Sequence, residues 1–142
     1  MKLVLDASVA LKWFFCDRPD EPDADTAAEI LKAYVTGLHE LLAPPHFMVE
    51  MCAVLAREAP DTVDTNLRDL LDLAIPVRDD AQVYSRAIHL SRDLGHRLFD
   101  TLYHAVALET EGAVLVTADQ NYLTQAQSAG RIRLLRHWGV ER

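Results

Sequence analysis

Two short apolar runs, KLVLDAS at residues 2–8 and VLVTAD at residues 114–119, decide the expected fold, and each leads into an aspartate, Asp6 and Asp119. Runs rich in valine and leucine that end at turn-forming residues are typical of buried strands. An aspartate after one strand is an ordinary way to begin a turn or a helix, so one case alone would mean little. Two cases suggest that the strand ends meet and that the carboxylates act together.

The rest of the chain alternates between strand and helix patterns. Further strand candidates are a short piece at LLAPP, AIPV around Ile75, and RIRLL from Arg131. Helical periodicity is found in SVALKWFF, DADTAAEILKAYVTGL, PHFMVEMCAVLARE, TNLRDLLDLA, DAQVYSRAIHLSRDLG and DTLYHAVALETEG. This alternation predicts an α/β fold with a central, mostly parallel sheet of about five strands and helices on both faces. Ligands of such sheets bind beyond the carboxyl ends of the strands, where we expect Asp6 and Asp119.

Length and composition predict one domain over residues 1–142, since half of the 142 residues are apolar. No apolar run approaches the roughly 20 residues that span a bilayer, so we expect a soluble cytoplasmic protein without membrane contact. Cys16 and Cys52 are too few for a disulfide framework and predict buried free thiols. The formal charge of −8 argues against attraction of nucleic acid to the whole surface, but not against a local basic patch or metal ions at an acidic cluster.

Two more acids are candidates because of their apolar neighbours. A step of about 100° per residue places Glu50 at the margin of an apolar stripe in PHFMVEMCAVLARE. The structural alternative is a boundary glutamate that reaches into solvent. Asp100 stands where the helical pattern of RLFDTLYHAVALETEG begins, so helix capping is its alternative, and capping does not exclude metal binding.

Three segments give the chain a recognisable order: LVLDASVALKWF, PPHFMVEMCAVLARE and LFDTLYHAVALETEGAVLVTAD. In these segments the chain resembles the PIN domain, and within it the VapC-type toxin ribonucleases, nearly from end to end. The resemblance implies a PIN-like three-layer fold. It places the family's four acidic positions on Asp6, Glu50, Asp100 and Asp119, and the hydroxyl residues that accompany them on Ser8 and Thr117.

The resemblance also implies an activity and partners. The expected activity is that of a Mg²⁺- or Mn²⁺-dependent endoribonuclease, the toxin of a type II toxin–antitoxin pair, acting on structured RNA such as transfer or ribosomal RNA. The expected partners are a second copy in a homodimer and a cognate antitoxin whose C-terminal segment occupies the nuclease groove.

The chemistry of such a cluster can be argued from the residues themselves. Two carboxylates about 4 Å apart repel by roughly 4 kcal/mol at an effective dielectric constant near 20, so four of them need protons or cations. Carboxylate oxygens suit the hard ions Mg²⁺ and Mn²⁺, and we expect all four acids to be catalytic residues and ligands of one or two ions that activate water. Ser8 and Thr117 are expected to orient a carboxylate or a water, with helix capping as the alternative for Ser8. Lys12 is a candidate phosphate contact, and a solvated lysine is its alternative.

Two other functions remain open at this point. A haloacid-dehalogenase-like phosphatase also has an aspartate after its first strand, but its pattern requires a second acid two residues later, where this chain has Ser8. A PIN-like module that binds RNA or protein without cutting is the non-enzymatic alternative, and the loss of one acid would favour it. All four acids are present.

Overall fold

The computed structural model describes residues 1–139, and its centre is a parallel sheet with the strand order β2-β1-β3-β4. Strand β1 (Lys2–Leu5) pairs with β2 (Glu40–Leu42) on one side and with β3 (Ala113–Thr117) on the other, and β4 (Ile132–Leu134) pairs with β3. The predicted α/β class and parallel pairing are confirmed. The described sheet has four strands rather than the five expected.

The prediction of a strand at AIPV, around Ile75, is wrong. Val77 forms one isolated parallel bridge with Ala43, whose N–H donates to Pro76 O at 2.9 Å and whose carbonyl accepts from Arg78 N at 2.9 Å. Pro76 has no N–H, and the chain beyond Ala43 continues into two further prolines. Without those donors the ladder cannot extend past a single residue on either side.

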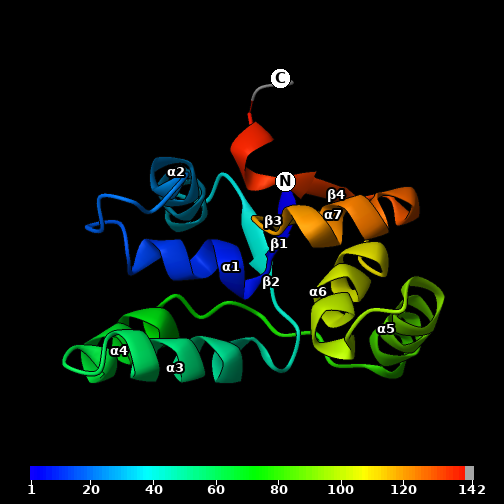
Figure 1. Cartoon of the computed structure of the whole chain (residues 1–142), viewed down its shortest axis with the longest axis horizontal. Helices are drawn as coiled ribbons and strands as arrows, with labels where there is room; N and C mark the ends of the chain where they lie inside the picture. Colours follow the sequence, from blue (N-terminus) through cyan, green and yellow to red (C-terminus); the bar gives the residue numbers. More distant parts are fainter. Residues whose placement is uncertain (140–142) are drawn as a thin grey trace.

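Helices follow the strands in the predicted order (Figure 1). Their bounds are α1 (Ala7–Ala10), α2 (Ala24–Val35), α3 (Phe47–Glu58), α4 (Val63–Asp72), α5 (Ala81–Leu94), α6 (Leu98–Leu108) and α7 (Gln120–Ala126), with 3₁₀ turns η1 (Leu11–Trp13), η2 (Gln127–Ala129) and η3 (Leu135–His137). Six of the seven α-helices in residues 1–139 overlap predicted segments, although α1, α4 and α6 begin one or two residues before them, and α7 was not predicted. None of the helices within residues 1–139 is both long and apolar enough to cross a membrane.

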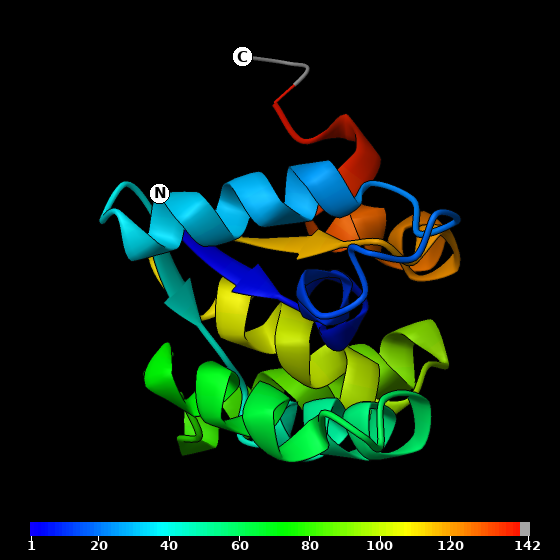
Figure 2. The same cartoon turned by 90° about the vertical axis from the view of Figure 1, so that its left-hand side faces the viewer.

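The helices cover both faces of the sheet and make three layers, as Figure 2 shows with α2 (light blue) on one face and α6 (yellow) on the other. Leu3 and Leu5 point to the α2 face, where they pack with Ile30. Val4 points to the opposite face and packs in the cluster that contains Met51 of α3 and Val106 of α6. Because β1 is covered on both sides, its sequence is a continuous apolar run rather than an alternating one.

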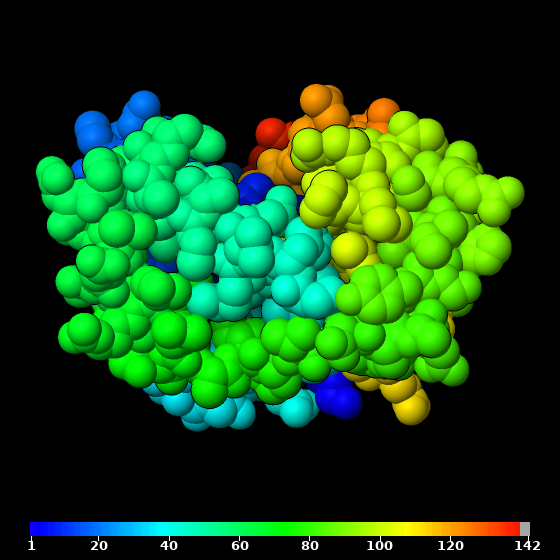
Figure 3. All heavy atoms as spheres, turned by 90° about the horizontal axis from the view of Figure 1, so that it is seen from below, coloured from blue at the N-terminus to red at the C-terminus, as the bar shows by residue number. Residues whose placement is uncertain are grey.

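The topology creates a crevice at the carboxyl end of β1. The chain leaves β1 toward β2 on one side and leaves the neighbouring strand β3 toward β4 on the other, so the two connections leave in opposite directions. Asp6 follows β1 directly, and Asp119 follows β3 after one intervening residue. Figure 3 shows a notch at this place, between α3 (teal) on one side and α6 and α7 (yellow and orange) on the other, with the N-terminal segment (dark blue) at its floor.

The two cysteines form no disulfide in the structure. Both are free thiols, as predicted, but Cys16 is exposed and Cys52 is only partly buried. The prediction that both thiols are buried is therefore wrong.

Candidate active site

Two hydroxyl groups hold the Asp6 carboxylate at the carboxyl end of β1. Ser8 Oγ donates to Oδ1, and Thr117 Oγ1 donates to Oδ2. Each hydroxyl also accepts a backbone N–H, from Ala118 at 3.1 Å for Ser8 and from Asp119 at 3.0 Å for Thr117. Since both hydroxyl oxygens already accept a hydrogen, their own protons are directed at Asp6, and the strand ends of β1 and β3 are joined through this carboxylate.

The positions of Ser8 and Thr117 bear on their predicted role. The N-cap position of α1 is Asp6, so the alternative that Ser8 caps this helix is wrong. Thr117 is fully buried as the last residue of β3. Both hydroxyls are placed to orient the Asp6 carboxylate, which is the arrangement that the predicted role requires.

The surroundings of Asp6 make its negative charge costly. Burial raises the pKa of Asp6 to about 6, although hydrogen bonds from Ser8 and Thr117 act in the opposite direction. The charge of Asp119 raises it further. The two aspartates that end the two strands are therefore close enough to repel each other.

Glu50 lies in the first turn of α3 and contacts two side chains. The Tyr103 hydroxyl donates to Glu50 Oε1, and His46 Nε2 lies 3.3 Å from the same oxygen. Burial alone would raise the pKa of Glu50, but the hydrogen bonds from His46 and Tyr103 outweigh it and lower the pKa below its ordinary value. Glu50 thus remains ionised at neutral pH, and its partners direct it inward rather than into solvent.

Asp100 lies in the first turn of α6 (Leu98–Leu108), three residues after the N-cap position. The N-cap position is Arg97, which makes no capping hydrogen bond with its side chain, so the capping explanation of Asp100 is wrong. Oδ2 of Asp100 is 2.7 Å from His96 Nε2 and 3.5 Å from an Arg97 nitrogen. The carboxylate is therefore held from the loop that precedes its helix.

Asp119 caps helix α7. Its Oδ1 accepts the N–H of Tyr122 at 3.1 Å, so the capping alternative is confirmed for this residue. Capping uses one oxygen of Asp119, and the negative charge of the same carboxylate raises the pKa of Asp6. The two roles coexist.

Two buried tyrosines lie within the electrostatic influence of three of the acids. Burial raises the pKa of Tyr103 far above its ordinary value, and the hydrogen bond to Glu50 and the charges of Glu50, Asp6 and Asp100 raise it further. Burial also raises the pKa of Tyr122, and the charges of Asp100 and Asp6 add to this effect. The charge of Asp6 thus acts on both tyrosines, and the charge of Asp119 acts on Asp6. That the four carboxylates form one site stays a prediction.

A family model described as PIN domain matches residues 3–127, a range that includes all four acids. The chain belongs to the PIN domain family. PIN domains have a nuclease-type fold and are generally metal-dependent nucleases. None of the curated proteins compared with this PIN domain matches it.

The donor set of this PIN domain fits a hard divalent cation. Its candidate ligands are carboxylate oxygens, which Mg²⁺ and Mn²⁺ prefer, and burial, with a smaller effect of the Asp119 charge, raises the pKa of Asp6, so a bound cation would offset the cost of its negative charge. Within residues 1–139, however, no three His, Cys, Asp or Glu side chains are already gathered as a metal site. That the four acids bind metal therefore stays a prediction.

Lys12 has internal partners rather than an open position. Its Nζ lies 2.8 Å from Glu21 Oε2 and 2.7 Å from Pro22 O, and only 6% of the residue is exposed. The solvated-lysine alternative is wrong, and the predicted contact with a phosphate gains no support, because the charge is already paired inside the protein.

Sequence reasoning missed four residues of the site: His46, Tyr103, His96 and Tyr122. A signal for the two histidines was present, since each stands four residues before one of the acids, the spacing that brings side chains together on a helix. Tyr103 stands three residues after Asp100 in the same helix, but its hydroxyl contacts Glu50 of another helix.

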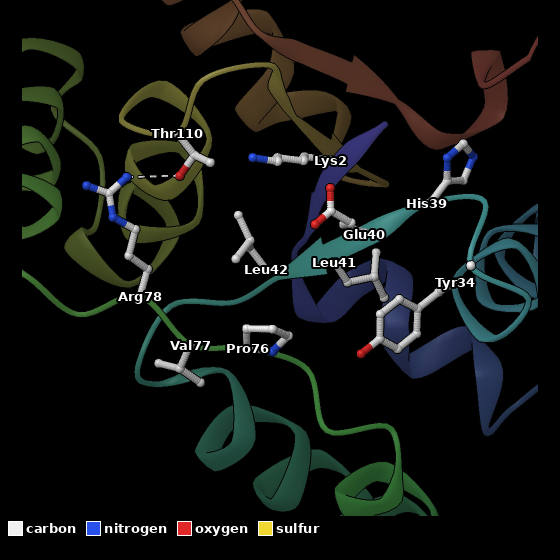
Figure 4. A pocket seen from close by; sticks show the side chains of 11 residues that line it. Lys2, Tyr34, His39, Glu40, Leu41, Leu42, Pro76, Val77, Arg78 and Thr110 are labelled. Carbon is white, nitrogen blue, oxygen red and sulfur yellow. Dashed lines mark hydrogen bonds between the residues drawn. The ribbon is translucent and has the colours of Figure 1, made fainter.

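A separate cavity of about 540 Å³ lies along the free edge of β2, lined among others by Lys2, Tyr34, Leu41 and Arg78 (Figure 4). Arg78 in its wall donates to Thr110 Oγ1 at 3.0 Å. None of the four acids lines this cavity. It is therefore distinct from the acidic site at the carboxyl ends of the strands.

Proposed function

We propose that this PIN domain is a Mg²⁺- or Mn²⁺-dependent endoribonuclease that hydrolyses RNA phosphodiester bonds at the notch. The observation that carries the proposal is the Asp6 carboxylate, which is held on both oxygens, has a raised pKa and is repelled by Asp119. A protein that needed Asp6 only for folding would gain nothing from this cost. A site that binds a cation would gain from it, because the cation interacts favourably with the ionised carboxylate.

The four acids, Asp6, Glu50, Asp100 and Asp119, are the proposed ligands. When bound there, a divalent cation supplies positive charge for the phosphate oxygens and a more acidic water. The protein's own contribution is orientation: Ser8 and Thr117 fix both oxygens of Asp6, and Tyr103 fixes Glu50. Lys12 is not assigned to RNA binding, since its ion pair with Glu21 would first have to open.

We further propose that the protein is the cytoplasmic toxin of a type II toxin–antitoxin pair that cleaves transfer or ribosomal RNA. Its resemblance to VapC-type toxins supports this role, a homodimer and a cognate antitoxin. An arginine of such a partner would supply the positive charge that the acidic cluster lacks. Val49 of α3 and Phe99 of α6 are exposed apolar residues beside Glu50 and Asp100 in sequence, and they offer surface for a partner.

Purified protein incubated with transfer and ribosomal RNA tests the activity. We expect internal cleavage with Mg²⁺ or Mn²⁺, none in excess chelator, and recovery when Mn²⁺ is added back. Asp6→Asn should be inactive, whereas Asp93→Asn, which alters an exposed acid of α5, should cleave normally. Undiminished cleavage in chelator would refute metal dependence.

One observation favours a second candidate, a PIN-like module that binds RNA or protein without cutting. No three potential metal ligands within residues 1–139 are gathered in advance. This candidate predicts RNA binding that is the same with and without Mn²⁺ and no cleavage in either condition. The same assay therefore separates the two functions.

A toxin role makes its own predictions. A short upstream reading frame that encodes a DNA-binding protein would support it, and light scattering after size exclusion would test the homodimer. A monomer at micromolar concentration would contradict the homodimer and leave the nuclease activity untouched.

A further inference from the structure

His96 connects two of the helices that carry the candidate ligands. It follows Gly95, which ends α5 in the left-handed conformation with φ of 61° and turns the chain toward α6. One side of the imidazole, Nε2, lies 2.7 Å from Asp100 Oδ2, and the other, Nδ1, lies 2.7 Å from Gln125 Oε1 of α7. A single ring thus spans from the acid of α6 to the helix that Asp119 begins.

Tyr122 fixes this ring from the side. The two ring centroids are 5.0 Å apart in an edge-on arrangement, and the backbone N–H of the same tyrosine donates to Asp119 Oδ1. The Tyr122 hydroxyl lies 2.9 Å from His104 Nδ1, and His104 Nε2 lies 2.7 Å from Gly130 O. Because Tyr122 and His104 are both buried, Tyr122 is held at three points and is a rigid support.

We propose that His96 is a positioning residue that, supported by Tyr122, sets Asp100 relative to Asp119 for metal binding. The inference rests on the proposed function and extends it to a residue that is not itself a ligand. His96 occupies Oδ2 of Asp100, while Oδ1 makes no hydrogen bond to any residue in the described part of the chain. One oxygen is therefore anchored and the other is left for a ligand.

The competing contacts of Asp100 are weak. Arg97 approaches Oδ2 only at 3.5 Å, and 75% of the Arg97 side chain is exposed, so that solvent and side-chain entropy reduce its effect. His96 is the closer partner and the less exposed one, with 18% of its side chain exposed. Removing it would release Asp100 to its other rotamers.

Glu50 provides an internal comparison, because His46 stands four residues before it just as His96 stands before Asp100. The His46 contact is longer, at 3.3 Å, and Tyr103 also holds the carboxylate. Loss of His46 would leave Glu50 with a partner, whereas loss of His96 leaves Asp100 with none but Arg97. The effect on metal affinity should therefore be larger at His96.

The test measures Mn²⁺ affinity by isothermal titration calorimetry of the full chain without RNA. Loss of a residue that orients a metal ligand typically costs about 10- to 100-fold in affinity, and we expect about 10-fold for His96→Ala. His96→Gln should recover most of the affinity, because its amide nitrogen can donate to Asp100 from the same four-residue spacing. His89→Ala, an exposed histidine of α5, is the matched control and should bind as the wild type does.

A purely structural role gives a different pattern. Unfolding in chelator would then show lower stability for His96→Ala, while Mn²⁺ affinity would equal that of the wild type, and this result overturns the inference. If His96→Ala does not fold, Gln125→Ala takes its place, since it keeps His96 but removes the contact at Nδ1; weaker Mn²⁺ binding supports the inference and wild-type affinity overturns it.

The wild type separates this inference from the proposed function. A wild type that neither binds Mn²⁺ nor cleaves RNA overturns both. A wild type that does both, beside a His96→Ala variant of equal affinity, overturns only the role of His96.

Discussion

Asp6→Asn should stabilise the metal-free protein at neutral pH, although it removes a carboxylate that accepts hydrogen bonds from two hydroxyl groups. Burial and the neighbouring charge raise the pKa of Asp6 from 3.8 to about 6. At about 1.4 kcal/mol per pKa unit, ionised Asp6 costs about 3 kcal/mol of the free energy of unfolding. The amide nitrogen of asparagine cannot accept from a hydroxyl, and one lost hydrogen bond costs about 1 kcal/mol.

The balance is a gain of about 2 kcal/mol, which raises the melting temperature by roughly 6–8 °C in a domain of this size. The stability difference between the variant and the wild type depends on pH. Below pH 3.8 Asp6 is protonated in the folded and the unfolded chain, and its raised pKa has no cost. As the pH rises toward 6 the unfolded chain loses this proton first, so the wild type loses stability relative to the variant, and above 6 the difference is constant.

Urea unfolding in chelator at several pH values between 4 and 8 measures this difference. Asp93→Asn is the control for the removal of one negative charge from the surface, and its curve should run parallel to that of the wild type. In millimolar Mn²⁺ the order should reverse, because a ligand bound only by the folded state stabilises the wild type and not the variant. A variant less stable than the wild type at pH 7.5 in chelator, or a difference that does not change with pH, would refute the reasoning.

Three further changes test other parts of the site. Asp119→Asn should leave stability in chelator unchanged or slightly higher, because asparagine also caps helices, and should abolish cleavage; an active variant with a normal Mn²⁺ response removes Asp119 from the site. Tyr103→Phe should cost about 2 kcal/mol at neutral pH, since Glu50 loses a hydroxyl donor, and denaturant curves that match the wild type would contradict this bond. Lys12→Ala should lower the free energy of unfolding by about 3 kcal/mol, because it leaves Glu21 unpaired. It should not weaken RNA binding more at low salt than at high salt. A selective loss of RNA affinity at low salt, measured by filter binding, would support the predicted contact of Lys12 with a phosphate.

The central strands could be predicted from the sequence because burial on both faces leaves an unbroken apolar run. Leu3, Val4 and Leu5 show this pattern, and so do Leu115 and Val116 of β3, which pairs with β1 in parallel. At the edge of the sheet the prediction failed, because the pairing of Val77 depends on which donors its neighbours retain rather than on its own apolar side chain. Helix α7 was missed because only Tyr122 and Ala126 of its seven residues are buried, too few to give a periodic stripe.

The sequence predicts the four acids as one site and also predicts Ser8 and Thr117, which hold Asp6 in the structure, but it does not predict the side chains that hold the other acids. Asp6 and Asp119 follow strands, which is a local signal. The contact of Tyr103 with Glu50 joins two helices, and the pairing of Lys12 with Glu21 is made through a loop, so neither is encoded by spacing along one element. Among the residues that were not predicted, the two histidines have a sequence signal, the four-residue spacing to Glu50 and Asp100, and that signal can be interpreted once the helices are placed.

The strand order has a consequence for the timing of synthesis. Strand β3 lies between β1 and β4, yet it is made long after β1, and its Thr117 donates the hydrogen bond that completes the surroundings of Asp6. A chain still emerging from the ribosome holds β1 and β2 without the strand that separates β1 from β4, so the acidic site cannot assemble until most of the sequence has been translated. For the proposed endoribonuclease, incomplete chains would thus be inactive while they are still attached to the ribosome, whose RNA is a proposed substrate.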